Sequence, residues 1–265
     1  MGVLVLEFFS VFFGSFETFL LVFARSIGTI AFNPILSRNN IPVRAKVALA
    51  VFIAFSVFMV INPVPVDTGV SPAVYLMMIV KEGFVGVVMG FITSMFLYCI
   101  QVSGELMDMQ SGLGMAKVFD PITNAQSSVM GSIISIVMYL YFFVINGHLS
   151  IVAIFAASYN VIPIGDWAIN FEVGLAVMSY FMLVLGLVIK LALPLVIAGL
   201  VVQVCIGLVM KAVPGIQIMM LNIQIKVLLG FWILFTIAAP MANYIDRYLW
   251  TWVETLEDSL SYIAL

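Results

Sequence analysis

The sequence contains little charge. Of its 265 residues only 9% are charged, whereas 64% are hydrophobic. A soluble domain is about a quarter charged and about half apolar. So few charges could not cover a surface that faces water, which excludes a soluble globular enzyme and a disordered protein. Lys and Arg number 10 against 13 Asp and Glu, and no basic run exists to neutralise phosphates, which excludes a nucleic-acid binder. The remaining class is a polytopic α-helical membrane protein.

Cysteine and histidine are scarce as well. Cys99 and Cys205 both lie in apolar runs, so we expect small buried hydrophobic residues and no disulfide framework. The single histidine, His148, follows Asn-Gly, which is typical of a turn or a helix kink and not of a metal site. The sequence also lacks a nucleophile elbow, a phosphate-binding glycine loop and zinc-ligand spacing. We therefore expect neither an enzyme nor a bound cofactor or metal.

Long apolar runs dominate what is present, and they predict helices. They cover residues 4–30, 47–61, 73–102, 129–162, 173–210 and 218–239. The second run has about 15 residues, which is short for a bilayer that needs about 20 helical residues. The fifth would be about 57 Å long as one straight helix, so it should tilt, break near Pro194 or project beyond the hydrocarbon. The fourth is interrupted at Asn146-Gly147-His148. The predicted fold is an all-α membrane protein of long, kinked helical hairpins.

Five charged residues lie inside these apolar runs: Glu17, Arg25, Lys81, Glu82 and Lys190. A charge at the bilayer centre costs about 3 kcal/mol on insertion scales, so such residues normally face a partner, a bundle interior or water. We expect polar contacts within a conduit or with another subunit. The alternative for the two lysines is that the side chain extends to the membrane surface from near a span end. Neighbouring residues are about 100° apart around a helix, so Lys81 and Glu82 cannot both face one groove.

Gly86 and Gly90 form a pair of small residues four positions apart. This spacing permits close backbone approach between membrane helices, so it predicts tight helix packing.

The stretch from residue 104 to 121 mixes methionines, glycines and charges between two apolar segments. Non-helical polar backbone is tolerated at membrane depth only when it is buried in protein or lines a cavity. Flexible methionine side chains suit a deformable seal around a variable cargo. The alternative is an ordinary loop exposed to solvent.

At these residues the sequence resembles the FliR/SctT family of type III export-gate proteins, over nearly the whole chain. The shared pieces are Arg25, Asn33-Pro34-Ile35-Leu36, Ile41-Pro42-Val43-Arg44-Ala45-Lys46, the stretch from Gly104-Glu105 to Phe119-Asp120-Pro121, Asn146-Gly147-His148-Leu149 and Ile162-Pro163-Ile164-Gly165. Their order and spacing carry the resemblance. One departure is Val213-Pro214-Gly215, where the family often has Pro-Gln.

The resemblance implies a subunit that assembles with FliP and FliQ into a helical export gate and contacts FlhB. This gate would pass unfolded flagellar subunits across the inner membrane. It also implies a FliP-like portion at 1–172, a FliQ-like hairpin at 173–240 and an amphipathic tail at 241–265. A loop at about 110–128 would plug the closed pore. The plug residues carried over are Met109, Gln110, Gly112, Gly114, Met115, Phe119, Asp120 and Pro121.

Two other functions remain open at this point. The first is the gate protein of a virulence type III system, although Phe119-Asp120-Pro121-Ile122-Thr123-Asn124 favours the flagellar branch. The second is a secondary transporter or channel that acts alone, with Pro194 and Asn146-Gly147 as helix breaks. No matched halves support the transporter interpretation.

Overall fold

All regular structure in the described part of the chain is helical. The computed structural model describes residues 16–33, 41–61, 71–115, 128–165, 172–212 and 218–264. The elements are α2 (Phe16–Ala31), α3 (Val43–Ile61), α4 (Pro72–Ser111), the short 3-10 helix η1 (Leu113–Met115), α6 (Val129–Val144), α7 (Gly147–Val161), α8 (Glu172–Ala212) and α9 (Ile218–Ala264). The predicted all-α class is therefore confirmed.

Three of these helices are long and apolar enough to cross a membrane: Val43–Ile61, Pro72–Ser111 and Glu172–Val209. The number rises to five if α6 with α7, and the two parts of bent α9, each count as one span. These helices belong to a membrane protein, as the composition indicated.

Helix α3 corrects the expectation that the second apolar run is too short to span a bilayer. The helix has 19 residues because it begins at Val43, four positions before the apolar run. Arg44 and Lys46 ended the apolar pattern but not the helix. Lysine and arginine are tolerated at the end of a membrane helix, because their long side chains can reach polar surroundings.

Helix α4 also extends beyond its apolar run, from residue 102 to Ser111. The added turns have one buried face, formed by Ser103, Gly104, Met107, Asp108 and Ser111. Spacing of three and four residues is the helical repeat, so polar and small residues continue the packed face of the helix. Met109 and Gln110, which we predicted in the plug loop, therefore lie in the last turn of α4.

The break between α6 and α7 and the bend in α9 both lie at or next to residues that disfavour a straight helix. Asn146 separates α6 from α7 with φ 57, a left-handed conformation, at the interruption predicted from Asn-Gly. Helix α8 continues through Pro194 without ending. Helix α9 continues past residue 239, so the predicted tail is part of it, and it bends by 64° between Gln224–Thr236 and Ala238–Ile263. Pro240 lacks the N–H that would bond to the Thr236 carbonyl, which accounts for a bend at this point.

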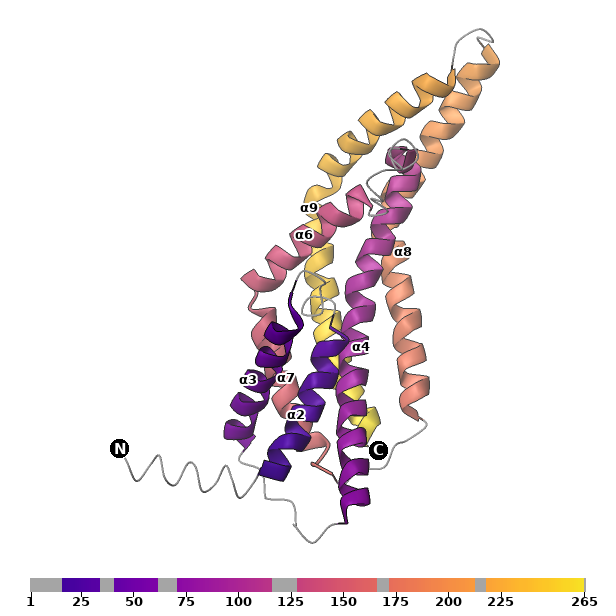
Figure 1. The fold of residues 1–265 in the computed structure, drawn as a ribbon. Coiled ribbons are helices and arrows are strands. Elements are labelled where there is room, and N and C mark those ends of the chain that lie inside the picture. The colour runs from indigo at the N-terminus through magenta and orange to yellow at the C-terminus, as the bar shows by residue number, and fades with distance from the viewer. Residues whose placement is uncertain are drawn as a thin grey trace. The chain divides into compact units, whose positions relative to one another are not determined.

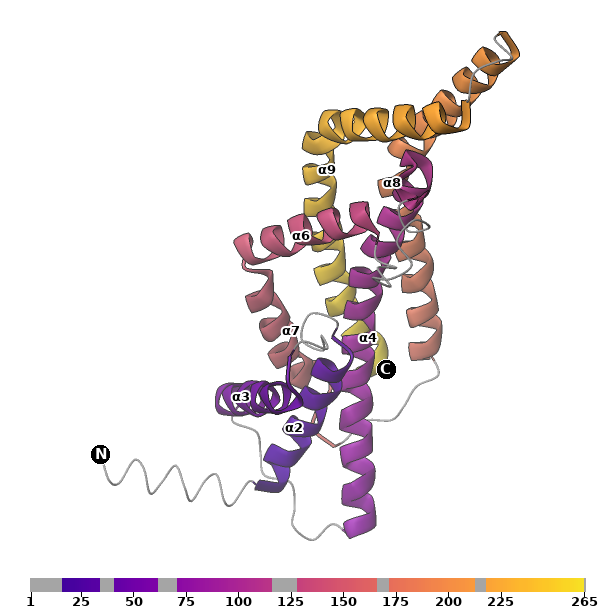
Figure 2. The same cartoon turned by 45° about the horizontal axis from the view of Figure 1, so that its top comes forward.

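The chain forms two compact units. The first contains residues Met1–Met95, Gly147–Tyr180 and Trp252–Leu265. In it, α3 packs against α2 and α7 (Figures 1 and 2). Leu21, Val22 and Ala54 are fully buried in its core, and the rings of Phe19 and Phe58 meet edge to face at 5.9 Å.

The second unit contains residues Phe96–Asn146 and Phe181–Thr251. Helices α8 and α9 run antiparallel from their joined ends (Figure 1), and Figure 2 shows the bend of α9. Two tyrosines of α9 tie it to its neighbours. Tyr244 Oη donates to the Leu187 carbonyl of α8 and Tyr248 Oη to the Phe96 carbonyl of α4, both at 2.6 Å.

The two cysteines differ in exposure. Cys99 is buried, as expected, but Cys205 is exposed, and that part of the prediction was wrong. An apolar run does not distinguish the inside of a membrane protein from its outside, because lipid tails are as apolar as leucine.

Candidate functional site

The end of α4 in the second unit is the described part of the predicted plug region. Helix α4 ends at Ser111, and Gly112 follows with φ 77. A glycine in the left-handed conformation just after a helix is a common C-terminal cap, because glycine has no Cβ to clash there. Met109 is 73% exposed on the last turn, whereas Ser111 is buried. The apolar methionine therefore points away from the packed face that holds the helix end.

Asp108 holds the start of α6 against the end of α4. Its Oδ2 accepts from the Val129 N–H at 2.8 Å and its Oδ1 from the Met130 N–H at 3.1 Å. Ser128 Oγ caps the same helix by accepting from the Gly131 N–H at 2.8 Å. A carboxylate at a helix N-terminus satisfies N–H groups that lack helical partners and interacts favourably with the helix dipole. The residues on both sides of segment 116–127 are thus tied together through one buried side chain.

Glycine contacts bring α4 and α6 together just below this cap. A Cβ on Gly104 would overlap the Gly131 backbone of α6, and a Cβ on Gly131 would lie 3.0 Å from the Gln101 carbonyl oxygen. The atoms in the way of a Cβ on Gly104 belong to backbone, which cannot rotate aside. The crossing of these two helices therefore requires glycine at position 104, and Gly131 lies at a tight point of the same crossing.

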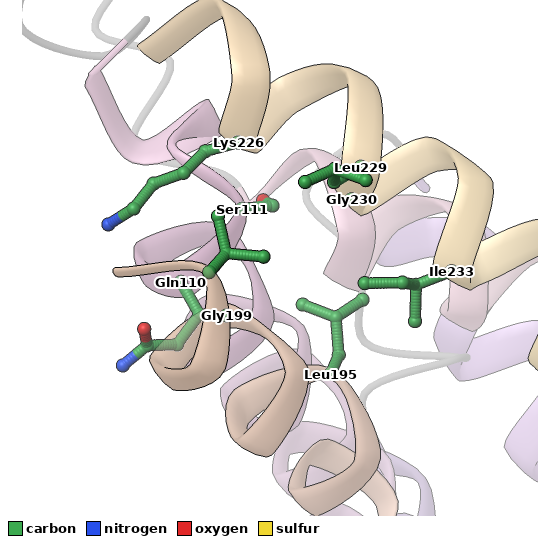
Figure 3. A pocket seen from close by; sticks show the side chains of 9 residues that line it. Gln110, Ser111, Leu195, Gly199, Lys226, Leu229, Gly230 and Ile233 are labelled. Atoms are coloured by element: carbon green, nitrogen blue, oxygen red, sulfur yellow. The ribbon is translucent and has the colours of Figure 1, made fainter. Parts of the chain in front are cut away.

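Helices α8 and α9 also meet the end of α4 through glycine. A Cβ on Gly199 would lie 3.0 Å from Gln110 Cβ, and one on Gly230 would lie 2.8 Å from Ser111 Cβ. These residues line a narrow pocket together with Leu195, Val202, Lys226, Leu229 and Ile233. Figure 3 shows Leu195 and Ile233 on one side of it, and the polar ends of Gln110 and Lys226 on the other. Lys226 Nζ donates to Gln203 Oε1 at 3.1 Å.

Several predicted plug residues are not part of this geometry. Phe119, Asp120 and Pro121 lie outside the described residues, as does the rest of segment 116–127. Gly114 lies in η1, where an added Cβ would be 3.5 Å from the Asp108 carbonyl oxygen. Met115 is the last residue of η1. Sequence reasoning did not single out Asp108, whose capping role depends on a residue 21 positions away.

A second polar site lies in the first unit, around Arg25 of α2. Its Nε donates to Glu82 Oε2 of α4 at 2.7 Å, and both side chains are fully buried. Its other nitrogens donate to Ser158 Oγ at 2.9 Å and to the Ile162 carbonyl at 3.2 Å. The guanidinium carbon lies 3.9 Å from the centre of the Tyr159 ring, a cation–π contact. Glu82 Oε1 accepts from the Gly165 N–H at 3.0 Å.

This network joins segments that are far apart in the sequence. Arg25, Glu82 and Ser158 come from α2, α4 and α7, and the Ile162 and Gly165 backbone groups follow α7. The sequence analysis singled out the two charged residues but neither Ser158 nor Tyr159. An available signal was Ile162-Pro163-Ile164-Gly165, in which Gly165 adopts φ 78. That turn directs backbone groups toward the ion pair.

The other predicted charges are arranged differently. Lys81 is half-buried, whereas its neighbour Glu82 is fully buried. Glu17 is exposed in the first turn of α2, where its backbone carbonyl accepts from Tyr75 Oη at 2.8 Å. Lys190 is exposed on α8 of the second unit. Among these five charged residues, Arg25 and Glu82 form the buried ion pair that the structure describes.

Gly86 and Gly90 lie where α4 crosses α2. A Cβ on Gly86 would overlap the Arg25 carbonyl oxygen, and one on Gly90 would lie 2.7 Å from the Thr29 carbonyl oxygen. On the other helix, a Cβ on Gly28 would lie 2.5 Å from the Gly83 carbonyl oxygen. The glycines let the two backbones touch, which positions Arg25 beside Glu82. Sequence reasoning did not single out Gly28.

The fold defines the class of this protein. It is a membrane protein with several candidate spans, a buried ion pair and helix crossings mediated by glycine. Residues 16–251 match the family model described as bacterial export proteins, family 1, and the chain belongs to this family. The family consists of transport proteins and not of enzymes. The resemblance to the FliR family is thereby confirmed.

Curated relatives match the chain over most of its length. The flagellar biosynthetic protein FliR of Escherichia coli K12 is 25% identical over 91% of this chain and 92% of its own. FliR of Bacillus subtilis is 24% identical over 94% of this chain and 97% of its own. The surface presentation of antigens protein SpaR of Shigella sonnei is 24% identical over 84% of this chain and 87% of its own.

Proposed function

We propose that this chain is a core subunit of the flagellar type III export gate in the inner membrane, at the flagellar basal body. With FliP and FliQ it would form the conduit that passes unfolded flagellar subunits, and it would contact FlhB. The observation that carries the proposal is similarity to FliR proteins of two distant bacteria over more than nine-tenths of the chain.

The proposed organisation follows the resemblance. Residues 1–172 form the FliP-like portion, 173–240 the FliQ-like hairpin and 241–265 the tail. The connection between α8 and α9 supports a hairpin, because α8 ends at Ala212 and α9 begins at Ile218. Glu17, Lys81 and Lys190 are proposed to make polar contacts within the assembly or its lumen, since Glu17 and Lys190 are exposed and Lys81 is half-buried in the isolated chain.

The loop at about 110–128 is proposed to plug the closed pore and to move aside for substrate. Apolar side chains such as Met109 and Phe119 would limit ion leakage, and glycines would allow the movement. The cap of Asp108 on α6 supports this proposal, because it fixes the two ends of the segment relative to each other. Movement of the loop then leaves the helices in place.

Removal of the gene from the bacterium that carries it tests the function. We expect loss of motility and of secreted flagellar subunits, with both restored by the unaltered gene. A strain that remains motile, or that loses secretion of virulence effectors while it keeps its flagella, would contradict the flagellar assignment. The second outcome would favour a virulence gate instead.

A further inference from the structure

A hollow in the second unit lies between α8 and α9, away from the end of α4. It is lined by Lys190, Leu191, Pro194, Pro240, Met241, Tyr244 and Arg247, and has a volume of about 260 Å³. Each helix contributes a proline to its wall. Pro194 has no N–H to donate to the Lys190 carbonyl, so α8 lacks one helical hydrogen bond at the wall of the hollow.

In the part of the chain that the structure describes, two cations line this hollow and no acidic residue does. Within the described residues Lys190 makes no ion pair or hydrogen bond, and Arg247 Nε reaches the Asn243 carbonyl only at 3.5 Å. The nearest acid in sequence is Asp246, but its Oδ1 accepts from Tyr141 Oη of α6 at 2.8 Å. Positive charge in an apolar setting requires an anion or water beside it. The hollow therefore offers a site for an anionic group.

Charge-free runs indicate the depth of this hollow in a membrane. Residues 191–210 of α8 and 227–245 of α9 contain no charged residue. The α8 run has about 20 residues and is about 30 Å long, which matches one hydrocarbon core, whereas the α9 run contains the 64° bend and is not straight. Since the helices are antiparallel (Figure 1), Lys190 and Arg247 stand together at one end of the two runs. Tyr244, Tyr248 and Trp250 lie nearby in sequence, and such residues gather where hydrocarbon meets headgroups.

We propose that this hollow binds the headgroup of an anionic phospholipid. Lys190 and Arg247 contact the phosphate, while Leu191, Pro194 and Met241 form an apolar wall for the start of an acyl chain. Basic pockets between membrane helices bind anionic headgroups through this combination of charge and apolar surface. The site is formed by α8 and α9 of this chain and does not depend on the export function.

Native mass spectrometry of the full chain, purified in detergent and titrated with single lipids, tests the proposal. We expect phosphatidylglycerol to bind and phosphatidylcholine to bind more weakly. Lys190→Gln or Arg247→Gln should each lower phosphatidylglycerol affinity about fivefold, and the double variant by the product of the two. Lys211→Gln is the matched control, because it removes an exposed cation of the same helix that does not line the hollow.

The same titration separates the alternatives. Equal affinity for the two lipids, or equal loss in the Lys211→Gln control, would overturn the proposal. Displacement of phosphatidylglycerol by millimolar inorganic phosphate would show that the apolar wall contributes nothing to affinity. That result would also overturn the proposal. If the double variant keeps its lipid but no longer co-purifies with a partner subunit, a partner carboxylate fills the hollow and the lipid assignment is wrong. Thermal unfolding of each variant in detergent confirms that it is folded.

Discussion

Arg25 and Glu82 form an ion pair of 2.7 Å from which water is excluded, and they join α2 to α4 across 57 positions of sequence. A buried charge is costly unless it is paired and hydrogen-bonded. Here Arg25 also has Ser158 and the Ile162 carbonyl, and Glu82 also has the Gly165 N–H. The first unit is therefore built around a charged pair whose polar atoms are satisfied.

Removal of one member of this pair should destabilise the protein strongly. Arg25→Met leaves Glu82 buried without its cation, at a cost of about 3–5 kcal/mol. The double variant Arg25→Met with Glu82→Leu should recover much of that loss, because no uncompensated charge remains. Thermal unfolding of the purified protein in detergent measures both. A single variant as stable as the parent would show that the pair contributes little.

Lys81→Ala provides the matched comparison for Glu82→Ala. The two residues are neighbours on α4, but Lys81 is half-buried and Glu82 is fully buried. We expect Glu82→Ala to lower the unfolding temperature and the yield, and Lys81→Ala to change the unfolding temperature little. Any effect of Lys81→Ala should appear in assembly or export. If both variants keep parental yield and export, the proposed role of these residues in the gate is lost.

Gly86→Ala should disrupt the crossing of α2 and α4, because the new Cβ would overlap the Arg25 carbonyl oxygen. Gly83→Ala is its control, since a Cβ at that position meets nothing within 4 Å. Alanine favours helix over glycine by up to about 1 kcal/mol, so the control should be neutral or stabilising. Unfolding temperature and expression level measure the difference. Equal behaviour of the two variants would contradict the backbone contact.

Asp108→Ala should loosen the start of α6, because two N–H groups lose their acceptors. Loss of a helix cap costs about 1 kcal/mol, and Asp108→Asn, which keeps one acceptor oxygen, should cost less. Hydrogen exchange followed by mass spectrometry should show faster exchange in peptides that contain Val129 and Met130. Peptides from α2 and α7 should exchange as in the parent. Unchanged exchange at the start of α6 would show that the cap is not needed.

Deletion of residues 112–120 tests the plug. We expect the assembled variant to conduct ions that the parental assembly excludes, measured as membrane conductance or ion sensitivity of growing cells. Asp108→Ala should show a smaller leak, because the segment loses the tie between its ends but remains present. An assembled deletion variant that leaks no more than the parent would exclude a plug at this position.

Much of the fold could be predicted from local patterns. The interruption at Asn146-Gly147 was visible because Asn tolerates the left-handed conformation that separates α6 from α7. The ends of α3 and α4 were missed because charged residues ended the apolar runs while the helices continued. In α4 the helical spacing of Ser103, Met107 and Ser111 carried the information, but two of these residues are polar, so the pattern was not a hydrophobic stripe.

The sites were less predictable, since they depend on pairing across the sequence. Charge in an apolar run identified Arg25 and Glu82 as unusual, but nothing local stated that they face each other. Nothing in the local sequence distinguishes Ser158 or Asp108. Ser158 gains its role from Arg25, and Asp108 from the start of α6, which the fold brings beside them. Gly28 has its role only because Gly83 lies opposite.

Co-purification tests the central claim most directly. The tagged full chain, expressed with FliP and FliQ, should draw both into one stable complex and should be poorly recovered when they are absent. Recovery of the chain alone or as a homo-oligomer, stable in detergent and unchanged by the presence of FliP and FliQ, would contradict a gate subunit and favour a transporter that acts alone.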